Sequence, residues 1–261
     1  AAGKDRYALF DAALHTEVKR RVQLEGDLRR AVAEGQLSLV YQPLYELGST
    51  RVIGFEALAR WSHPELGAIG PDVFIPIAEE TGLIVPLTDF VLRIACTDLK
   101  GWQQSDPAFA GLTMNVNVSG KDLAHHGLVA RITRALVSAR LEPQHLSVEL
   151  TENILMDQLK VALPLLEDLR TLGVGLSVDD FGTGYSSLAH LSSLPVDSLK
   201  IDRSFIRGMR SGSKDAAVVQ AVVNLGHALH KRVVAEGIEN VQQLEQLREM
   251  GCQAGQGYHL S

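Results

Sequence analysis

Short apolar segments alternate with longer amphipathic segments along most of the chain. An amphipathic helix is predicted over residues 8–34, and two adjacent strands follow it at residues 37–47 and 52–61. Further strands are predicted at 112–119, 146–152, 174–181, 198–205 and 232–239, and further helices at 87–104, 126–140, 158–172, 214–230 and 241–250. Apolar positions recur every three to four residues in the helices, whereas the strands are short apolar runs. Strands that alternate with helices predict βα units and a parallel sheet.

The size of this repeating region favours a closed barrel over an open sheet. A (β/α)₈ barrel takes about 250 residues, and we predict a TIM-like (β/α)₈ barrel over residues 37–261, preceded by an N-terminal connector helix in residues 1–36. An open doubly wound sheet is the competing architecture, but the GxGxxG turn typical of it is absent after the first strand. The two opening strands have no helix between them, which predicts an irregular start to the barrel.

Composition and charge narrow the classes of protein that this chain can be. With 46% hydrophobic and 21% charged residues it is a globular chain, and no apolar run reaches the roughly 18 to 20 residues of a membrane span. A net charge of −6 argues against a partner of duplex nucleic acid. Cys96 and Cys252 match no zinc or disulfide spacing and are interpreted as buried thiols. We therefore expect a cytoplasmic domain with no membrane contact of its own.

Polar residues stand near the carboxyl end of almost every predicted strand. They are Glu56, Asn117, Glu149, Asp179 with Asp180, Lys200 with Asp202, Glu236 and Gln256. A single residue of this kind is most often a helix cap or a solvated loop residue. Caps do not recur at the same end of successive strands, however, and in a parallel barrel these ends open on one face. The pattern predicts one site.

Several carboxylates in one pocket repel one another, and either protonation or bound cations must relieve that repulsion. Ligation by oxygen alone favours Mg²⁺ or Mn²⁺ over zinc or copper. The adjacent Asp179 and Asp180 could share two ions, as in the two-metal sites that cleave phosphodiesters.

These residues lie in motifs that resemble those of the EAL-domain cyclic di-GMP phosphodiesterase family. The motifs are FEALARW around Glu56, NVS from Asn117, ELTE from Glu149, DDFGTGYSSL from Asp179, LKIDRSF around Lys200, AEGIE around Glu236 and QGY from Gln256. The resemblance covers residues 37–261. It implies a TIM-like barrel whose first strand is antiparallel, which agrees with the irregular opening.

The resemblance also implies residue roles. It implies that one metal is held by Glu56, Asn117, Glu149 and Asp179, and the second by Asp179, Asp180 and Glu236. The catalytic residues would be Lys200, Glu236 and Glu56, with Lys200 contacting the attacking water. Substrate contacts would come from Gln42, Leu58, Arg60, Asp202, Glu239 and Gln256.

The glycine-rich segment that follows Asp180 has two interpretations. It is either an ordinary turn or the family's flexible loop near a dimer contact, tethered by Glu152. A kinase-type metal motif and a phosphate-binding loop are excluded, because the partner motifs of both are missing. His63, Trp61 and Trp102 are interpreted as core or scaffold residues.

Two functions remain open from the sequence, and a third is disfavoured. The first is hydrolysis of cyclic di-GMP to linear pGpG with two Mg²⁺ or Mn²⁺ ions, inhibited by Ca²⁺. The second is a cyclic di-GMP receptor without turnover, although the complete ligand set favours the enzyme. A purely structural role would need clustered arginine partners for the carboxylates. We further expect a homodimer, and a sensory or GGDEF domain upstream in a longer protein.

Overall fold

The strands of the protein close into a ring. The computed structural model describes residues 12–125, 127–184 and 188–261. In this part of the chain the sheet has nine strands in the order β1-β9-β8-β7-β6-β5-β4-β2-β3, and β1 also pairs with β2, which closes the barrel. The strands are β1 (Leu37–Glu46), β2 (Arg51–His63), β3 (Gly67–Ile69), β4 (Thr113–Asn117), β5 (Leu146–Thr151), β6 (Gly175–Phe181), β7 (Ser198–Ile201), β8 (Arg232–Ala235) and β9 (Ala254–Gly255).

The first strand runs against the others, as the sequence predicts. β1 is antiparallel to both of its neighbours, β2 and β9. The pairs from β2–β4 round to β8–β9 are all parallel. The predicted TIM-like barrel with an antiparallel first strand is therefore confirmed.

Helices surround this barrel. They are α1 (Ala12–Glu34), α2 (Pro71–Thr81), α3 (Ile84–Ser105), α4 (Gly120–Ala124), α5 (Leu128–Ala139), α6 (Glu152–Asp157), α7 (Leu159–Leu172), α8 (Leu188–Ser193), α9 (Arg203–Gly208), α10 (Lys214–Ala228) and α11 (Val241–Glu249), with 3₁₀ turns η1 (Pro107–Phe109) and η2 (Pro143–His145). The six predicted helices correspond to α1, α3, α5, α7, α10 and α11. None of the described helices is long and apolar enough to cross a membrane.

The elements that the sequence analysis does not predict are short or contain proline. α2 has Pro71 in its first turn and Pro76 inside, and it ends at Gly82 in the left-handed conformation with φ 76°. An internal proline removes a helical hydrogen bond, so the sequence of residues 71–81 does not predict a continuous helix. α4, α6, α8 and α9 have five or six residues each, too few for helical periodicity to show.

Alternation along each strand separates an apolar outer face from a polar inner face. Outward side chains such as Met114, Val148, Leu176 and Leu199 are completely or almost completely buried in the main core beneath the helices. Each such side chain stabilises the fold by about 1.5–3 kcal/mol. The intervening residues point into the barrel, and these include Glu149 and Lys200. The core therefore lies between strands and helices, and the interior of the ring remains available for polar chemistry.

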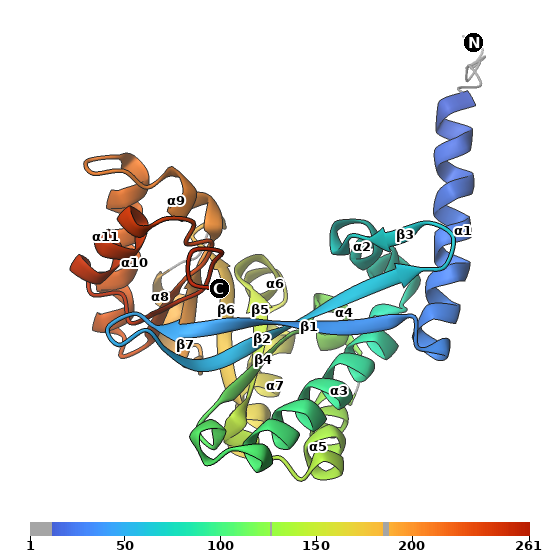
Figure 1. The fold of residues 1–261 in the computed structure, drawn as a ribbon, viewed down its shortest axis with the longest axis horizontal. Helices are drawn as coiled ribbons and strands as arrows, with labels where there is room; N and C mark the ends of the chain where they lie inside the picture. The colour runs from blue at the N-terminus through green and yellow to red at the C-terminus, as the bar shows by residue number, and fades with distance from the viewer. Residues whose placement is uncertain (1–11, 126, 185–187) are drawn as a thin grey trace, which may run out of the picture.

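A second, smaller core joins α1 to the far end of the β1–β2 hairpin. Figure 1 shows these two strands continuing away from the rest of the barrel toward α1, α2 and β3. Leu24 and Leu28 of α1 pack with Trp61 and Phe74 in this core. His63 Nε2 lies 3.1 Å from Asp27 Oδ2, and both residues are buried. The Nδ1 atom of His63 accepts two backbone hydrogen bonds, so Nε2 carries the proton toward Asp27.

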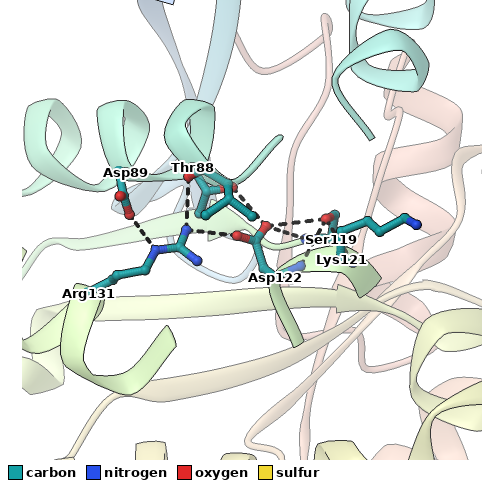
Figure 2. Close-up of polar contacts among 7 residues, drawn as sticks. Thr88, Asp89, Ser119, Lys121, Asp122 and Arg131 are labelled. Atoms are coloured by element: carbon teal, nitrogen blue, oxygen red, sulfur yellow. Dashed lines mark hydrogen bonds and ion pairs between the residues drawn. The ribbon is translucent and has the colours of Figure 1, made fainter. Parts of the chain in front are cut away.

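A buried polar network fixes the segment that follows β4 (Figure 2). Arg131 of α5 donates to Asp89 Oδ1 at 2.5 Å and to Asp122 Oδ1 at 2.8 Å. Asp122 also accepts from Thr88 Oγ1 at 2.8 Å and forms a capping box with Ser119. Because a buried charge is costly unless it is paired, this network holds α3, α4 and α5 in one arrangement. It thereby anchors the chain two residues beyond Asn117.

Candidate functional site

An open cavity of about 530 Å³ lies at the carboxyl ends of the parallel strands. Its lining residues are Gln42, Glu56, Asp180, Thr183, Asp202, Arg203, Glu236, Gly237, Glu239, Gln256, Gly257 and Tyr258. Residues from β1, β2 and the exits of β6, β7, β8 and β9 therefore meet at one mouth. We call this cavity the mouth site.

Lys200 lies at the centre of the carboxylates of the mouth site. Its ammonium is 2.7 Å from carboxylate oxygens of Glu149 and Glu236, 3.0 Å from Glu56 and 3.2 Å from Asp179. The side chain is 1% exposed, so it does not extend to solvent as a strand-end surface lysine would. Lys200 therefore belongs to the chemistry of this site.

A bulge at the end of β6 brings two successive aspartates to one place. Neighbouring residues of a strand normally point to opposite faces. The β6–β7 register shifts between Val178 and Phe181, and Asp180 adopts a left-handed φ of 53°, a conformation that aspartate tolerates better than most residues. As a result Asp179, Asp180 and Glu236 each offer an oxygen within 4.8 Å of the others.

The charges of this cluster do not balance. Glu56, Glu149, Asp179, Asp180 and Glu236 supply five carboxylates, and the structure places one ammonium among them. Burial raises the pKa of Glu149 well above its usual value. It raises the pKa of Glu236 to about 7 and that of Asp180 to about 6, with further contributions from nearby carboxylates.

Glu56 and Lys200 are the exceptions in the cluster. Burial alone would raise the pKa of Glu56, but Lys200 and hydrogen bonds from Gln256 and Asn117 outweigh it, so the pKa is lowered. Burial alone would lower the pKa of Lys200, but Glu149, Glu236 and Glu56 raise it well above its usual value. The ion pair between Glu56 and Lys200 is thus favoured, and the raised pKa values of Glu149, Glu236 and Asp180 reflect negative charge that one ammonium does not balance.

Two amide side chains orient Glu56. Asn117 Nδ2 donates to Glu56 Oε1 at 2.8 Å, and Gln256 Nε2 donates to Glu56 Oε2 at 2.7 Å and to Glu236 Oε1 at 2.9 Å. Gln42 lies opposite Glu56 in the β1–β2 register. The helix cap after β4 is Ser119, so Asn117 is not the cap that its position after a strand could suggest.

The donor set fits hard divalent cations. Every ligating group is a carboxylate or amide oxygen, as Mg²⁺ and Mn²⁺ prefer. Glu149 Oε1 is buried and accepts no hydrogen bond in the described part of the chain, and a buried carboxylate oxygen is costly to leave without a partner. An added cation would both satisfy this oxygen and offset the excess negative charge.

Mg²⁺ should stabilise the protein more at pH 8 than at pH 5.5. Glu236 and Asp180 have pKa values of about 7 and about 6, above their ordinary values of 4.5 and 3.8. Without metal, the stability that their protonated forms provide is therefore lost as the pH rises through these values. Ligands must lose their protons to bind metal, so the gain from the cation grows over the same range.

This pH dependence is measured as the difference in Tm with and without Mg²⁺ at each pH, since a ligand of the native state raises Tm. The double variant Asp180→Asn, Glu236→Gln should show a smaller and flatter difference. An equal Tm shift for the native chain at both pH values would contradict the assignment of these carboxyls to a cation site.

The structure brings only some of the predicted substrate contacts to the mouth. Gln42, Asp202, Glu239 and Gln256 line it. Leu58 and Arg60 do not line it. They follow Glu56 on the same face of β2. The Arg60 guanidinium donates to the backbone carbonyl of Ala59 at 2.9 Å. Asp202 is also the N-cap of α9, with Oδ1 accepting from Ser204 N at 3.0 Å. The ordinary capping role therefore applies to Asp202.

Glu152 binds the backbone of the glycine-rich loop. Its Oε2 accepts from Gly182 N at 2.7 Å and from Gly184 N at 3.4 Å. A Cβ at Gly184 would lie 2.9 Å from Glu152 Oε1, so a larger residue there would displace the Glu152 side chain. The central residues of the loop, 185–187, lie outside the described residues, and the predicted dimer contact there remains a prediction.

Three side chains at the mouth are absent from the sequence-based set. They are Thr183, Arg203 and Tyr258. Arg203 is exposed and directly follows the LKID segment, so its place in that motif could have identified it as an anion contact. Tyr258 is 88% exposed and could stack on a planar group, but a lone aromatic residue near the C-terminus gives no such signal.

Known proteins resemble this chain along nearly its whole length. The family model described as EAL domain matches residues 25–261. Two Pseudomonas aeruginosa proteins are each 44% identical: the bifunctional diguanylate cyclase/cyclic di-GMP phosphodiesterase MucR over 99% of this chain, and the cyclic di-GMP phosphodiesterase NbdA over 100%. The chain covers 37% and 33% of their lengths, so it spans about a third of each.

Solved structures extend the similarity to three dimensions. A structure described as the PaMucR phosphodiesterase in complex with c-di-GMP has a TM-score of 0.88 at 46% identity, covering 92% of this chain and 96% of that one. The EAL enzyme Bd1971 in its cGMP-bound form has a TM-score of 0.87 at 32% identity, covering 95% and 68%. With a family match over nearly the whole barrel and this agreement in fold, the chain belongs to the EAL domain family.

Proposed function

We propose that this chain hydrolyses one phosphodiester bond of cyclic di-GMP, giving linear pGpG. The observation that carries the proposal is the acidic cluster of the mouth site, with five carboxylates around the Lys200 ammonium. The names of MucR and NbdA and the c-di-GMP complex of PaMucR support the same activity. A receptor without turnover would have no need for so complete a set of ligands.

The cofactors of this proposal are two Mg²⁺ or Mn²⁺ ions. One would be held by Glu56, Asn117, Glu149 and Asp179, and the second by Asp179, Asp180 and Glu236. When bound, such ions polarise the phosphate and activate water for attack. The proximity of Asp179, Asp180 and Glu236 supports the second set.

The chain's own residues orient the substrate and the water. Lys200, held by four carboxylates, hydrogen-bonds the attacking water, and Glu236 accepts a proton. Gln42 and Glu239, which both line the mouth, contact the nucleotide, while Leu58 and Arg60 contact parts of it that extend along β2. Asp202 and Gln256, which also line the mouth, complete the proposed substrate contacts.

The direct test is anion-exchange analysis of cyclic di-GMP incubated with the purified chain. With Mg²⁺ or Mn²⁺ we expect conversion to pGpG, and after exhaustive chelation no conversion. Calcium should inhibit, because it prefers more ligands at longer distances than a site suited to Mg²⁺ offers. Binding of cyclic di-GMP without any turnover in either metal would instead establish the receptor function.

A homodimer and a cytoplasmic location complete the proposal. The dimer contact would lie around the loop after Asp180. This loop directly follows Asp179 and Asp180, two of the proposed metal ligands, and Glu152 binds its backbone. A contact between copies there would therefore act on the metal site. We expect sedimentation to show self-association of the chain; a strict monomer with full specific activity would refute the dimer. Upstream, α1 would connect the barrel to a sensory or GGDEF domain, in line with the bifunctional name of MucR.

A further inference from the structure

A second cavity enters the barrel from the face opposite the mouth site. It has a volume of about 520 Å³, and its outer rim includes the exposed residues Gln144, Arg170 and Arg232, which lie near the amino-terminal ends of the strands. Its lining includes Lys200, whose side chain is 1% exposed. The same side chain thus closes this cavity and supplies the ammonium of the mouth site.

Much of the wall of this lower cavity is formed by small polar residues. The interior of a (β/α)₈ barrel is usually filled by bulky branched side chains. Here the inward residues of β4 to β7 in the cavity lining are Thr113, Asn115, Ser147, Gly175, Ser177 and Ser198. The opposite wall carries Leu44 and Val234. Small polar residues of β4 to β7 therefore line this cavity together with the apolar residues Leu44, Leu146, Val174 and Val234.

Asn115 gives this cavity a group that calls for a ligand. The residue is 8% exposed, and its amide has no hydrogen-bond partner among the described residues, whereas Ser198 Oγ donates to Ser177 Oγ at 2.9 Å. Asn115 lies beside Ser147 in the β4–β5 register. Buried amides without a protein partner are normally satisfied by ordered water, provided that the site is polar and large enough. Both conditions hold here.

We propose that the lower cavity is a hydrated shaft that delivers water to Lys200 from the face opposite the substrate. Its ligand is water, held by the Asn115 amide and the serine hydroxyls. The catalytic part of this inference rests on the proposed hydrolase function: each turnover consumes one water, while a bound cyclic dinucleotide covers the mouth. The shaft itself is a property of the fold and can be tested without any substrate.

The first test asks whether small solutes reach the shaft. Ser147→Cys would place a thiol on its wall, while the natural Cys96 and Cys252 are buried. Methyl methanethiosulfonate should label Ser147→Cys in the folded protein, as measured by mass spectrometry. The matched control is Val148→Cys, the next residue of β5, which is buried in the outer core and should stay unlabelled. Protection of Ser147→Cys to the same extent as Val148→Cys would overturn the shaft.

The second test fills the shaft. Ser147→Leu should lower kcat roughly tenfold, because a reactant that is no longer held in place loses its proximity advantage, while KM and the Tm shift caused by Mg²⁺ stay the same. Ser147→Ala leaves the shaft open and should affect kcat much less. If Ser147→Leu does not fold, Asn115→Leu serves instead: it changes the side-chain volume little but removes the amide that would hold the water, so it should also lower kcat.

The outcomes separate this inference from the proposed function. A folded, filled variant with the kcat of the native chain would overturn the delivery of water. Labelling of Ser147→Cys together with a native chain that hydrolyses no cyclic di-GMP would refute the hydrolase and the catalytic use of the shaft together, while leaving access of small solutes to the shaft established.

Discussion

Replacing Lys200 by alanine is expected to lower kcat for cyclic di-GMP hydrolysis by about 10²-fold to 10⁴-fold, the range for loss of a proton-transfer contact. The ammonium is buried and lies within 3.2 Å of four carboxylates. Substrate affinity should fall much less, because Lys200 is not part of the lining of the mouth.

The metal affinity of the variant distinguishes a catalytic lysine from a structural one. Lys200 competes with cations for Glu56, Glu149, Asp179 and Glu236, so Lys200→Ala should bind Mg²⁺ at least as tightly as the native chain, by calorimetry. Lys160→Ala, which removes an exposed lysine, is the matched control and should retain native kcat. A Lys200→Ala kcat within about threefold of native, well below the catalytic range, would return Lys200 to a structural role.

The fold could be predicted from the sequence because its long elements are strongly periodic. The six predicted helices and the principal strands recur in the structure, and the antiparallel β1 follows from the family resemblance. Strand ends were less predictable. β8 ends at Ala235 and β7 at Ile201, because Glu236 and Asp202 leave the sheet to face the mouth. At these two positions the contacts of the site, and not the local apolar pattern, determine where the strand ends.

The residues of the site could be identified from the sequence, but their arrangement could not. Nothing in the alternation of β6 indicates the bulge that turns Asp180 toward Asp179. Similarly, Glu56 lies in the middle of β2, not at its end, because β2 continues to His63 and packs against α1. The buried position of Lys200 depends on carboxylates from four other strands or strand exits, which local sequence cannot bring together.

Removing a carboxylate from the mouth site should abolish turnover while changing stability in opposite directions at two positions. Glu56→Gln and Glu236→Gln each lose a proposed metal ligand, and we expect at least about 10²-fold lower kcat for both. In metal-free protein at pH 8, however, Glu236→Gln should raise Tm. The pKa of Glu236 is about 7, so its ionised form destabilises the fold above that pH, and a neutral amide removes this cost.

Glu56→Gln should instead lower Tm under the same conditions. The pKa of Glu56 is lowered, because Lys200 and two amide donors together outweigh its burial, so its charge stabilises the fold at pH 8 and is lost with the substitution. Glu65→Gln, which removes an exposed charge beyond the end of β2, is the control for both variants. The two measurements are the Tm of each variant with chelator present and its kcat with Mg²⁺ present. Equal changes in Tm for the two variants would show that Lys200 does not distinguish Glu56 from Glu236. Native turnover in either variant would show that the substituted glutamate is not a metal ligand.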